Sequence, residues 1–558
     1  MIAATAGPRR GGRLEWSLAL AAAAASAALV CWVGRETWFR LDVWEFLTAR
    51  EAGDFASWVR PHAGHLQWVA VGLHRLLYGA VGLDFWPWYF LPHVLGHAAL
   101  SLLLWRVLLR RGADRGLALA VYLVVLFLGV SAFLSSIAIG GLLVLALLLL
   151  VAQRLDAAAA PRLPEKALVA LALAVMATSS SLGVAGVAGC LAAVVLTRSL
   201  RRWWWCFLPA AAAYGAWYAV WGGRGQQGRV HWSYLVKVPG DALTLLGNAT
   251  SRLIGFDGGG VAVGAVVAAA LAGGLGWLAW KGRLRRWDLV FVGALGAYLV
   301  MLTLVRGGAG KVSLDTTRYS YPVVMLAVPL VAPHLRLPAR WPAGVRTAVL
   351  ILLASGVVGL NAWQRGADTA AIARETSQGR VAISTVGQWV AAGEPAVDSI
   401  HLRYDLGIGM AGQLTIADVR GLLADGWEPA PAGLWERADQ VQGLLRLNLT
   451  GRRNPAPGPP ALLFAGETSE GCVAVPPGAE RRFTVAAAGQ FYLQPAGQGE
   501  PGSLSLVWRD GFGEFPREIV VTDRTAVAAA APPAGGAVLS VFNGGERRLS
   551  VCKVAAGA

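Results

Sequence analysis

Long uncharged apolar stretches constrain this chain more than any other feature. Residues 117–134 and 137–151 carry no charged side chain. Each approaches the roughly 20 residues that a helix needs to cross about 30 Å of hydrocarbon. Lipid offers the backbone no hydrogen-bond partners, so such stretches must be helical. Only 15% of the residues are charged and 56% are hydrophobic, whereas soluble proteins carry roughly 25% charged residues. The sequence therefore predicts a mainly α, polytopic helical membrane protein.

About eleven apolar segments have spanning length by this criterion. They lie at approximately 14–34, 86–109, 116–134, 136–153, 167–182, 183–198, 203–222, 259–280, 287–305, 320–335 and 343–361. The fifth and sixth are short, so they form either two spans, a re-entrant pair or one kinked unit. The first is longer than the apolar core of a signal peptide, and we interpret it as a retained span.

The basic residues cluster in short loops on one side of this pattern. The chain has a formal charge of +16. The arginine-rich N-terminus shares its side with residues 110–115, 154–166, 198–202, 281–286 and 334–346. The positive-inside rule makes that side cytoplasmic, in a multi-pass cell-membrane protein. The first loop, residues 221–258, residues 306–319 and everything after about 362 then lie outside the cytoplasm. Because the charge is explained by orientation, no nucleic-acid partner is expected.

The C-terminal third has a different pattern. We expect a membrane module over 1–361, a helical and linker region over 362–460, and a small β-sandwich-like extracytoplasmic domain over 461–558. The middle region holds an amphipathic helix at 369–392 and a proline-rich linker. Short β-rich runs follow, separated by glycine and proline turns, at 482–485, 490–493, 503–508 and 537–542. Cys472 and Cys552 are the only cysteines in this outer part, and they are expected to form a disulfide in an oxidising compartment.

Two carboxylates follow the first span directly. Asp42 and Glu45 lie in the segment 38–47 and, three residues apart, would share one face of a helix. Carboxylates at a membrane surface are costly and often functional. One of them near an acceptor hydroxyl could serve as a general base. The alternative is a solvated loop or a helix-capping pair. Residues 66–78 have apolar positions on one helical face, which predicts an interfacial helix in the same loop.

Histidines form two pairs. His62 and His65 occur as Pro-His-x-x-His, where they could contact substrate or hold a metal. Without a convincing third ligand we predict no metal site, although a divalent ion stays open. His93 and His97 lie four residues apart within the second span. We favour structural hydrogen bonding for this pair over a role in a cavity.

A second polar region follows the ninth span. Residues 306–321 bring together Arg306, Lys311, Arg318 and Tyr319. Outer-facing arginines are not explained by the positive-inside rule. The guanidinium fork matches phosphate oxygens bidentately, so this loop is a candidate phosphate-binding region. Walker, Rossmann and zincin motifs do not occur in the sequence.

The order of these features resembles the GT-C superfamily of glycosyltransferases, which are polytopic enzymes that use polyprenyl-phosphate-linked sugars. Trp38-Phe-Arg-Leu-Asp-Val-Trp44 and Val59-Arg-Pro-His-Ala-Gly-His-Leu-Gln-Trp68 are similar to stretches of uncharacterised actinobacterial-type members. Thr317-Arg-Tyr-Ser-Tyr-Pro322 resembles their Arg-Tyr element before a late span. The resemblance covers roughly residues 14–335. The paired acids of the family are reduced to one, since Leu41 precedes Asp42 and Val43 follows it.

The resemblance implies transfer of a sugar from a polyprenyl-phosphate donor to an outer-face acceptor, a cell-envelope glycan or protein. It implies catalytic roles for Asp42 and Glu45. It also implies phosphate or substrate binding by Arg318 and Tyr319, with Arg306, Lys311, His62 and His65. Some relatives use a divalent metal. Two other functions remain open: a carrier or flippase for a lipid-linked glycan, and a non-catalytic scaffold whose β domain binds cell-wall polymer.

Overall fold

The computed structural model describes most of the chain. The residues outside it are 1–10, 51–52, 63–64, 129–137, 158–160, 223–231, 257–259, 307–316, 336–341, 394–395, 397, 403–407, 409–410, 430–446, 450–461, 464–471, 486–488, 497–502, 511–512, 521–524, 530–536, 544–547 and 554–558.

The chain forms two compact units. The first contains residues 1–37 and 50–374, and the second contains residues 38–49 and 375–558. The short segment 38–49, which carries the acids of the first loop, therefore belongs with the C-terminal third.

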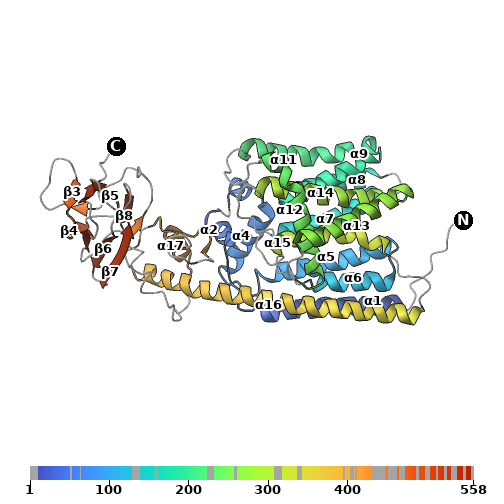
Figure 1. Ribbon diagram of the computed structural model, residues 1–558, viewed down its shortest axis with the longest axis horizontal. Helices are drawn as coiled ribbons and strands as arrows, with labels where there is room; N and C mark the ends of the chain where they lie inside the picture. Colours follow the sequence, from blue (N-terminus) through green and yellow to red (C-terminus); the bar gives the residue numbers. More distant parts are fainter. Residues whose placement is uncertain are drawn as a thin grey trace. The chain divides into compact units, whose positions relative to one another are not determined.

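The first unit is a helical bundle. Six helices are long and apolar enough to cross a membrane, by length and composition, in the described part of the chain. They belong to α1 (Gly11–Val33), α5 (Leu91–Arg110), α7 (Ala138–Asp156), α13 (Gly260–Trp280), α14 (Arg286–Arg306) and α16 (Ala343–Ala391). The part of α16 from Glu375 onward belongs to the second unit. The shorter elements are α3 (Phe55–Val59), α4 (Trp68–Val81), α6 (Arg115–Leu126), α8 (Leu163–Ser179), α9 (Ser181–Leu196), α10 (Leu200–Trp203), η2 (Trp204–Phe207), α11 (Leu208–Trp221), η3 (Trp232–Lys237), α12 (Val238–Leu253), α15 (Thr317–Val331) and η5 (Ala332–His334). Figure 1 shows most of them side by side with nearly parallel axes. The prediction of a helical membrane protein is confirmed.

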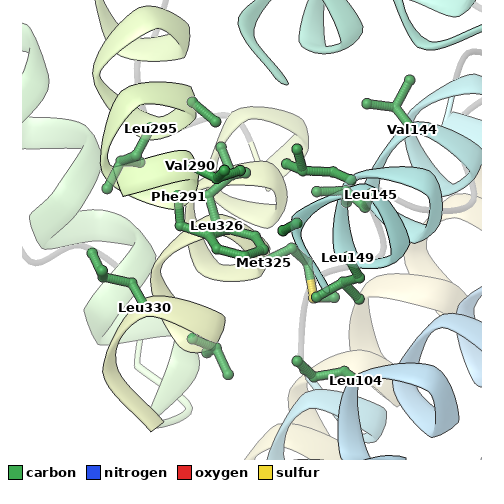
Figure 2. Packing of buried hydrophobic residues seen from close by; sticks show 14 of the residues in the cluster. Leu104, Val144, Leu145, Leu149, Val290, Phe291, Leu295, Met325, Leu326 and Leu330 are labelled. Atoms are coloured by element: carbon green, nitrogen blue, oxygen red, sulfur yellow. The ribbon is translucent and has the colours of Figure 1, made fainter. Parts of the chain in front are cut away.

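The bundle core is made of apolar side chains, aliphatic and aromatic, and of close backbone contacts. Figure 2 shows Leu326 of α15 near Phe291 of α14, with Leu145 of α7 nearby, and all three are buried. Without a hydrophobic drive between helices in lipid, small residues that let backbones approach stabilise such contacts. A Cβ built on Gly189 of α9 would lie 2.4 Å from the Val290 carbonyl oxygen of α14. The α9–α14 interface therefore depends on glycine.

Two predicted segments end differently in the structure. The segment 116–134 forms a helix, α6, that already ends at Leu126. The last predicted span, 343–361, and the predicted amphipathic helix, 369–392, are one uninterrupted helix of 49 residues, α16. The expected break is absent because residues 362–368 contain no proline and continue the helix.

The fifth and sixth predicted spans form two separate helices, α8 and α9, joined at Ser180. The backbone of Ser180 is extended, with φ −170° and ψ 165°. A Cβ on Gly183 would lie 1.6 Å from the Met176 carbonyl oxygen, so the two helices meet closely just after the turn. A kinked single helix is therefore excluded, and glycine is required at this position.

The second unit contains the short helices α2 (Asp42–Thr48) and α17 (Ile416–Ala424) and two five-stranded antiparallel sheets. The sheet orders are β1-β8-β5-β10-β3 and β2-β4-β9-β6-β7. The strands are β1 (Leu447–Leu449), β2 (Leu462–Leu463), β3 (Cys472–Val475), β4 (Glu480–Val485), β5 (Gly489–Ala496), β6 (Ser503–Asp510), β7 (Gly513–Val520), β8 (Thr525–Ala529), β9 (Ala537–Asn543) and β10 (Arg548–Lys553). All four β-rich runs named from the sequence lie within strands.

The predicted disulfide is present. Cys472 and Cys552 lie directly opposite each other on the paired strands β3 and β10, and their sulfur atoms are bonded. The bond links residues 80 positions apart and fixes the outer strand β3 to its sheet.

Candidate functional site

The two acids of the first loop begin a helix. Asp42 is the first residue of α2, and Glu45 follows one turn later. Four apolar side chains of α2 are buried, while Asp42 and Glu45 are half-buried on the remaining face. An ionised carboxylate in the first turn is favoured by the helix dipole. The arrangement leaves two carboxylates presented together on a short, anchored helix.

Aromatic packing anchors the start of α2 within the second unit. The centroids of the Trp38 and Trp44 rings are 5.2 Å apart. The Arg380 guanidinium lies 5.8 Å from the centroid of the Trp38 ring. The Trp38 amide donates a hydrogen bond to Thr376 Oγ1 at 3.0 Å. The residue before the helix, Leu41, has a positive φ of 47°. Contacts within the second unit therefore fix the backbone conformation at Asp42.

Gly412 completes this anchor. Its own φ is +57°, and a Cβ built there would lie 2.2 Å from the Leu41 carbonyl oxygen. Only glycine fits such a close approach at a positive φ.

In the first unit, the His62–His65 pair forms a tight turn. Each amide donates to the other residue's carbonyl oxygen at 2.9 Å, and the His62 side chain is buried. The preceding chain is fixed by Arg50, which sequence reasoning did not single out. Its guanidinium donates to the carbonyl oxygens of Ser57, Arg60 and Pro61 at 2.9, 3.2 and 3.1 Å. The signal that could have identified Arg50 was available, since it is another outer-facing arginine without a topological explanation.

The Arg-Tyr element forms the first turn of α15. Tyr319 is buried, with 8% of its surface exposed. The structure describes the backbones of Arg318, in α15, and Arg306, the last residue of α14, but not their side chains. Lys311 lies outside the described residues.

Tyr321 ties this turn to the bundle through a group that we call the Leu126 carbonyl cluster: Ser26, His97, Tyr321 and Arg365 around the carbonyl oxygen of Leu126. The imidazole of His97 lies 2.8 Å from the Tyr321 hydroxyl through Nδ1 and 3.2 Å from the carbonyl oxygen through Nε2. A carbonyl only accepts, so Nε2 carries the proton and Nδ1 accepts from Tyr321. The hydrogen bonding expected of His97 is confirmed.

Arg365 and Ser26 complete the Leu126 carbonyl cluster. Arg365 is 1% exposed and donates to the Ser26 hydroxyl at 2.8 Å and to the Leu126 carbonyl oxygen. Ser26 also donates to that oxygen, at 3.2 Å. The last carbonyls of a helix have no partner within it, and the end of α6 is satisfied in this way. The Leu126 carbonyl cluster therefore joins residues of five helices: α1, α5, α6, α15 and α16.

A second buried histidine pair lies on α4 and α5. His74 Nδ1 donates to the Ala70 carbonyl oxygen at 2.7 Å, and His93 Nδ1 donates to that of Tyr89 at 3.1 Å. The ring centroids of His74 and His93 are 6.2 Å apart. Burial, reinforced by the neighbouring His93, lowers the pKa of His74 from 6.5 to about 4. Each imidazole is held by the carbonyl oxygen four residues before it, and His74 is neutral at physiological pH.

Among the described residues, no group of three or more His, Cys, Asp or Glu side chains could hold a metal ion. The predicted residues are thus brought together in three places: Asp42 with Glu45 on α2, His62 with His65 in a turn, and Tyr319 on the α15 turn fixed by Tyr321. Asp42 and Glu45 belong to the second unit, and the others belong to the first.

These features define a polytopic helical membrane protein with a small C-terminal β-sheet region. No protein-family description and no curated protein matches the chain. Among solved structures, the chain is similar to ArnT from Cupriavidus metallidurans bound to undecaprenyl phosphate, with 15% identity and a TM-score of 0.42 over 74% of this chain and 87% of ArnT. It is also similar to the mycobacterial arabinofuranosyltransferase AftD, with 14% identity and a TM-score of 0.34 over 96% of this chain and 60% of AftD.

Proposed function

We propose that this protein is a membrane glycosyltransferase that moves a sugar from a polyprenyl-phosphate donor to an extracytoplasmic cell-envelope acceptor. The observation that carries the proposal is the pair of half-buried carboxylates on α2, directly after the first membrane helix and anchored by Trp38, Trp44 and Gly412. The sequence resemblance of this loop to GT-C enzymes supports the same reading.

Asp42 is the proposed general base. Sugar transfer with inversion requires a group that accepts the proton of the acceptor hydroxyl as the new glycosidic bond forms. Asp42 opens α2, and Glu45 lies on the same face as a second candidate for this role. His62 and His65 are proposed to contact substrate, because their turn is held rigidly by Arg50.

Arg318 is the proposed ligand of the lipid phosphate, with Tyr319, Arg306 and Lys311 assisting. The departing phosphate gains negative charge as the glycosidic bond breaks, and a guanidinium fork stabilises that charge bidentately. Arg318 is in the first turn of α15, whose backbone Tyr321 and His97 fix to the bundle. The support for this role is the fixed backbone of the turn that carries Arg318.

The proposed orientation places the N-terminus in the cytoplasm and the second unit outside it. The Cys472–Cys552 disulfide supports this, because disulfides persist in oxidising compartments. Exposed positions Arg283 and Glu480 allow a direct test. In intact cells an impermeant thiol reagent should label Glu480→Cys and not Arg283→Cys, and the reverse pattern would invert the topology.

Sugar transfer by the purified full-length protein from labelled polyprenyl-phosphate sugars tests the catalytic roles. Asp42→Asn keeps the side-chain shape and removes the proton acceptor, so turnover should fall about 10²–10⁴-fold, with donor binding spared. Arg318→Ala should weaken donor binding and turnover together, and Arg318→Lys should restore little because it lacks the fork. Asp84→Asn, an exposed acid in the loop between α4 and α5, is the matched control and should leave turnover unchanged.

Each result bears on a named residue. Loss of turnover in Glu45→Gln alone would move the general base from Asp42 to Glu45. Turnover equal to wild type in both Asp42→Asn and Glu45→Gln would contradict the proposal. A wild-type protein that binds the lipid donor and never cleaves it would favour the carrier function instead.

A further inference from the structure

Two adjoining cavities lie at the end of the first unit that carries the basic loops. The first, of about 360 Å³, is lined by side chains of α6, α12, α13, α15 and α16, all apolar except Thr250. The second, of about 630 Å³, lies among α1, α6 and α16. Ala120, Leu350 and Ala354 line both, so the two cavities lie on either side of the contact between α6 and α16. Both volumes fall in the range of about 300–1,000 Å³ that is typical of ligand sites.

The apolar lining of these cavities suits a hydrocarbon chain. Apolar cavities do not retain water. The side chains around the openings are exposed on the lipid-facing surface, with Leu18 at 52% and Ile351 and Leu353 both at 61%. A cavity that opens to the hydrocarbon of the bilayer is filled by a lipid chain.

The arginine side chain Arg346 lines the second cavity at the end nearest the lipid headgroups. Arg346 lies three residues after Ala343, where α16 begins, and the other α16 residues of the lining lie further along that helix. Its Nε atom is enclosed by protein and has no hydrogen-bond partner among the described residues. Asp114 also lines this cavity, but its carboxylate caps α6 by accepting from the Leu117 amide at 3.1 Å. The site thus presents a guanidinium at the depth of the headgroups and aliphatic walls below it.

This site is far from the Arg-Tyr element. Arg346 precedes Arg365 by 19 residues on α16, which at about 1.5 Å per residue is roughly 28 Å along the helix axis. Arg365 shares the Leu126 carbonyl cluster with Tyr321, three residues after Arg318. The separation is close to the full hydrocarbon thickness of about 30 Å. A lipid held at Arg346 therefore belongs to the opposite leaflet from a donor phosphate held at Arg318.

We propose that the two cavities hold the two acyl chains of one anionic glycerophospholipid, with its phosphate at Arg346. Two chains on either side of the contact between α6 and α16 match the paired cavities, whereas a polyprenyl phosphate has a single chain. Apolar contact alone gives little preference over bulk lipid, because lipid tails are as apolar as leucine. Selectivity must therefore come from the charge of Arg346, and basic pockets between membrane helices bind anionic headgroups in this way.

Native mass spectrometry of the full-length protein in mild detergent tests the proposal, with added phosphatidylglycerol and phosphatidylcholine as probes. The wild type should retain phosphatidylglycerol preferentially, one molecule per chain. Arg346→Gln should reduce that preference about fivefold, since an arginine near the surface contributes on the order of that factor. Arg283→Gln removes an exposed charge from a basic loop at the same end, and it should change nothing.

A second pair of variants tests the cavities themselves. Ala354→Trp places an indole in the wall that both cavities share and should abolish lipid retention. Leu352→Trp on the same helix points to the surrounding lipid, where Leu352 is 74% exposed, and should retain the lipid. Thermal unfolding of both variants shows whether a loss of lipid retention comes from a filled cavity or from a misfolded protein. The Arg346→Gln variant leaves the apolar cavity walls unchanged.

Several results would overturn the proposal: equal retention of the two probes by the wild type, equal behaviour of Arg346→Gln and Arg283→Gln, or a polyprenyl phosphate as the molecule bound at Arg346. Sugar transfer is not part of the measurement. The outcome of the lipid-retention measurement therefore does not bear on the proposed glycosyltransferase activity.

Discussion

The two ends of the membrane bundle use different polar chemistry. At the end with the basic loops, Arg111 pairs with the Asp156 carboxylate, and His334 lies 2.8 Å from the Asp288 carboxylate. The Arg111 guanidinium also lies 4.8 Å from the Trp287 ring, and the Trp287 amide donates to Asp156 at 3.3 Å. We call these five residues the basic-end cluster. The two ion pairs at this end each join one side chain to another, Arg111 to Asp156 and His334 to Asp288.

At the opposite end, side chains are matched to the backbone. Arg50 donates to three loop carbonyls, Arg365 and His97 donate to the Leu126 carbonyl, and His74 donates to the Ala70 carbonyl. This end contains the helix that stops early and the short helix α3 of the first loop. Irregular backbone at membrane depth is tolerated where protein groups satisfy it. Arg50 therefore holds the first loop in place, and Arg365 and His97 satisfy the last carbonyl of α6.

The largest effect is expected for Arg365→Gln. The change removes charged hydrogen bonds to Ser26 and to the Leu126 carbonyl, each worth about 1.5–3 kcal/mol. The free energy of unfolding should fall by about 3 kcal/mol, as measured by denaturant unfolding in detergent. Arg374→Gln, on the exposed surface of the same helix, is the control. A loss below about 1 kcal/mol for Arg365→Gln would show that the carbonyl cluster does not stabilise the bundle.

The basic-end cluster should instead show strong coupling between two side chains. Arg111→Met and Asp156→Asn should each cost about 2 kcal/mol, because each leaves a partly buried partner unmatched. The double variant should cost less than the sum by about 1–2 kcal/mol in a double-mutant cycle. Arg365→Gln combined with Asp156→Asn should be additive, since the two sites are far apart. Additive costs for Arg111 and Asp156 would remove the difference between the two ends.

Much of the architecture could be predicted because local patterns determine it. Run length identified the apolar helices, and alternation with turn residues identified strands such as β6 and β9. Spacing alone indicated that Asp42 and Glu45 share a face of one helix. The Cys472–Cys552 bond followed from elimination, since the remaining cysteines lie in apolar segments.

The parts that could not be predicted depend on contacts between distant residues. Nothing near Leu126 indicates that α6 ends there, because its carbonyl is satisfied by Ser26, 100 residues earlier, and by Arg365, 239 residues later. The apolar run continues to 134, so composition favoured a longer span. Arg365 follows a predicted span end and was therefore assigned to the outer region. Whether a polar residue ends a helix or is buried within a bundle is decided by its neighbours in space.

Acid should destabilise the protein through His74, which lies on α4, outside the helices of spanning length. Its pKa is lowered from 6.5 to about 4, so the folded state holds the neutral imidazole. This contribution to stability is complete above about pH 6.5 and is lost as the pH falls toward 4. By pH 4.5 the loss should reach roughly 2 kcal/mol. Unfolding measured from pH 7.5 to 4.5 checks this, and His74→Leu should flatten the dependence. An equal pH dependence in wild type and His74→Leu would assign it to other groups.

The smallest expected effect isolates a single bond in the Leu126 carbonyl cluster. Tyr321→Phe removes the hydroxyl that donates to His97 Nδ1 at 2.8 Å and keeps the ring that lies 5.7 Å from the imidazole. His97 Nε2 keeps its bond to the carbonyl, so the cost should be about 1 kcal/mol, as for a neutral hydrogen bond. Tyr218→Phe, at an exposed ring, should cost nothing measurable.

Nitrogen-15 NMR of labelled histidine gives a readout that packing alone would not change. The Nδ1 resonance of His97 should shift in Tyr321→Phe, because this nitrogen loses its donor, while Nε2 stays protonated. An unchanged Nδ1 resonance would mean that Tyr321 does not donate a hydrogen bond to His97. The first turn of α15 would then be fixed by packing, as in the interior of the bundle, and not by a hydrogen-bond path to a backbone carbonyl.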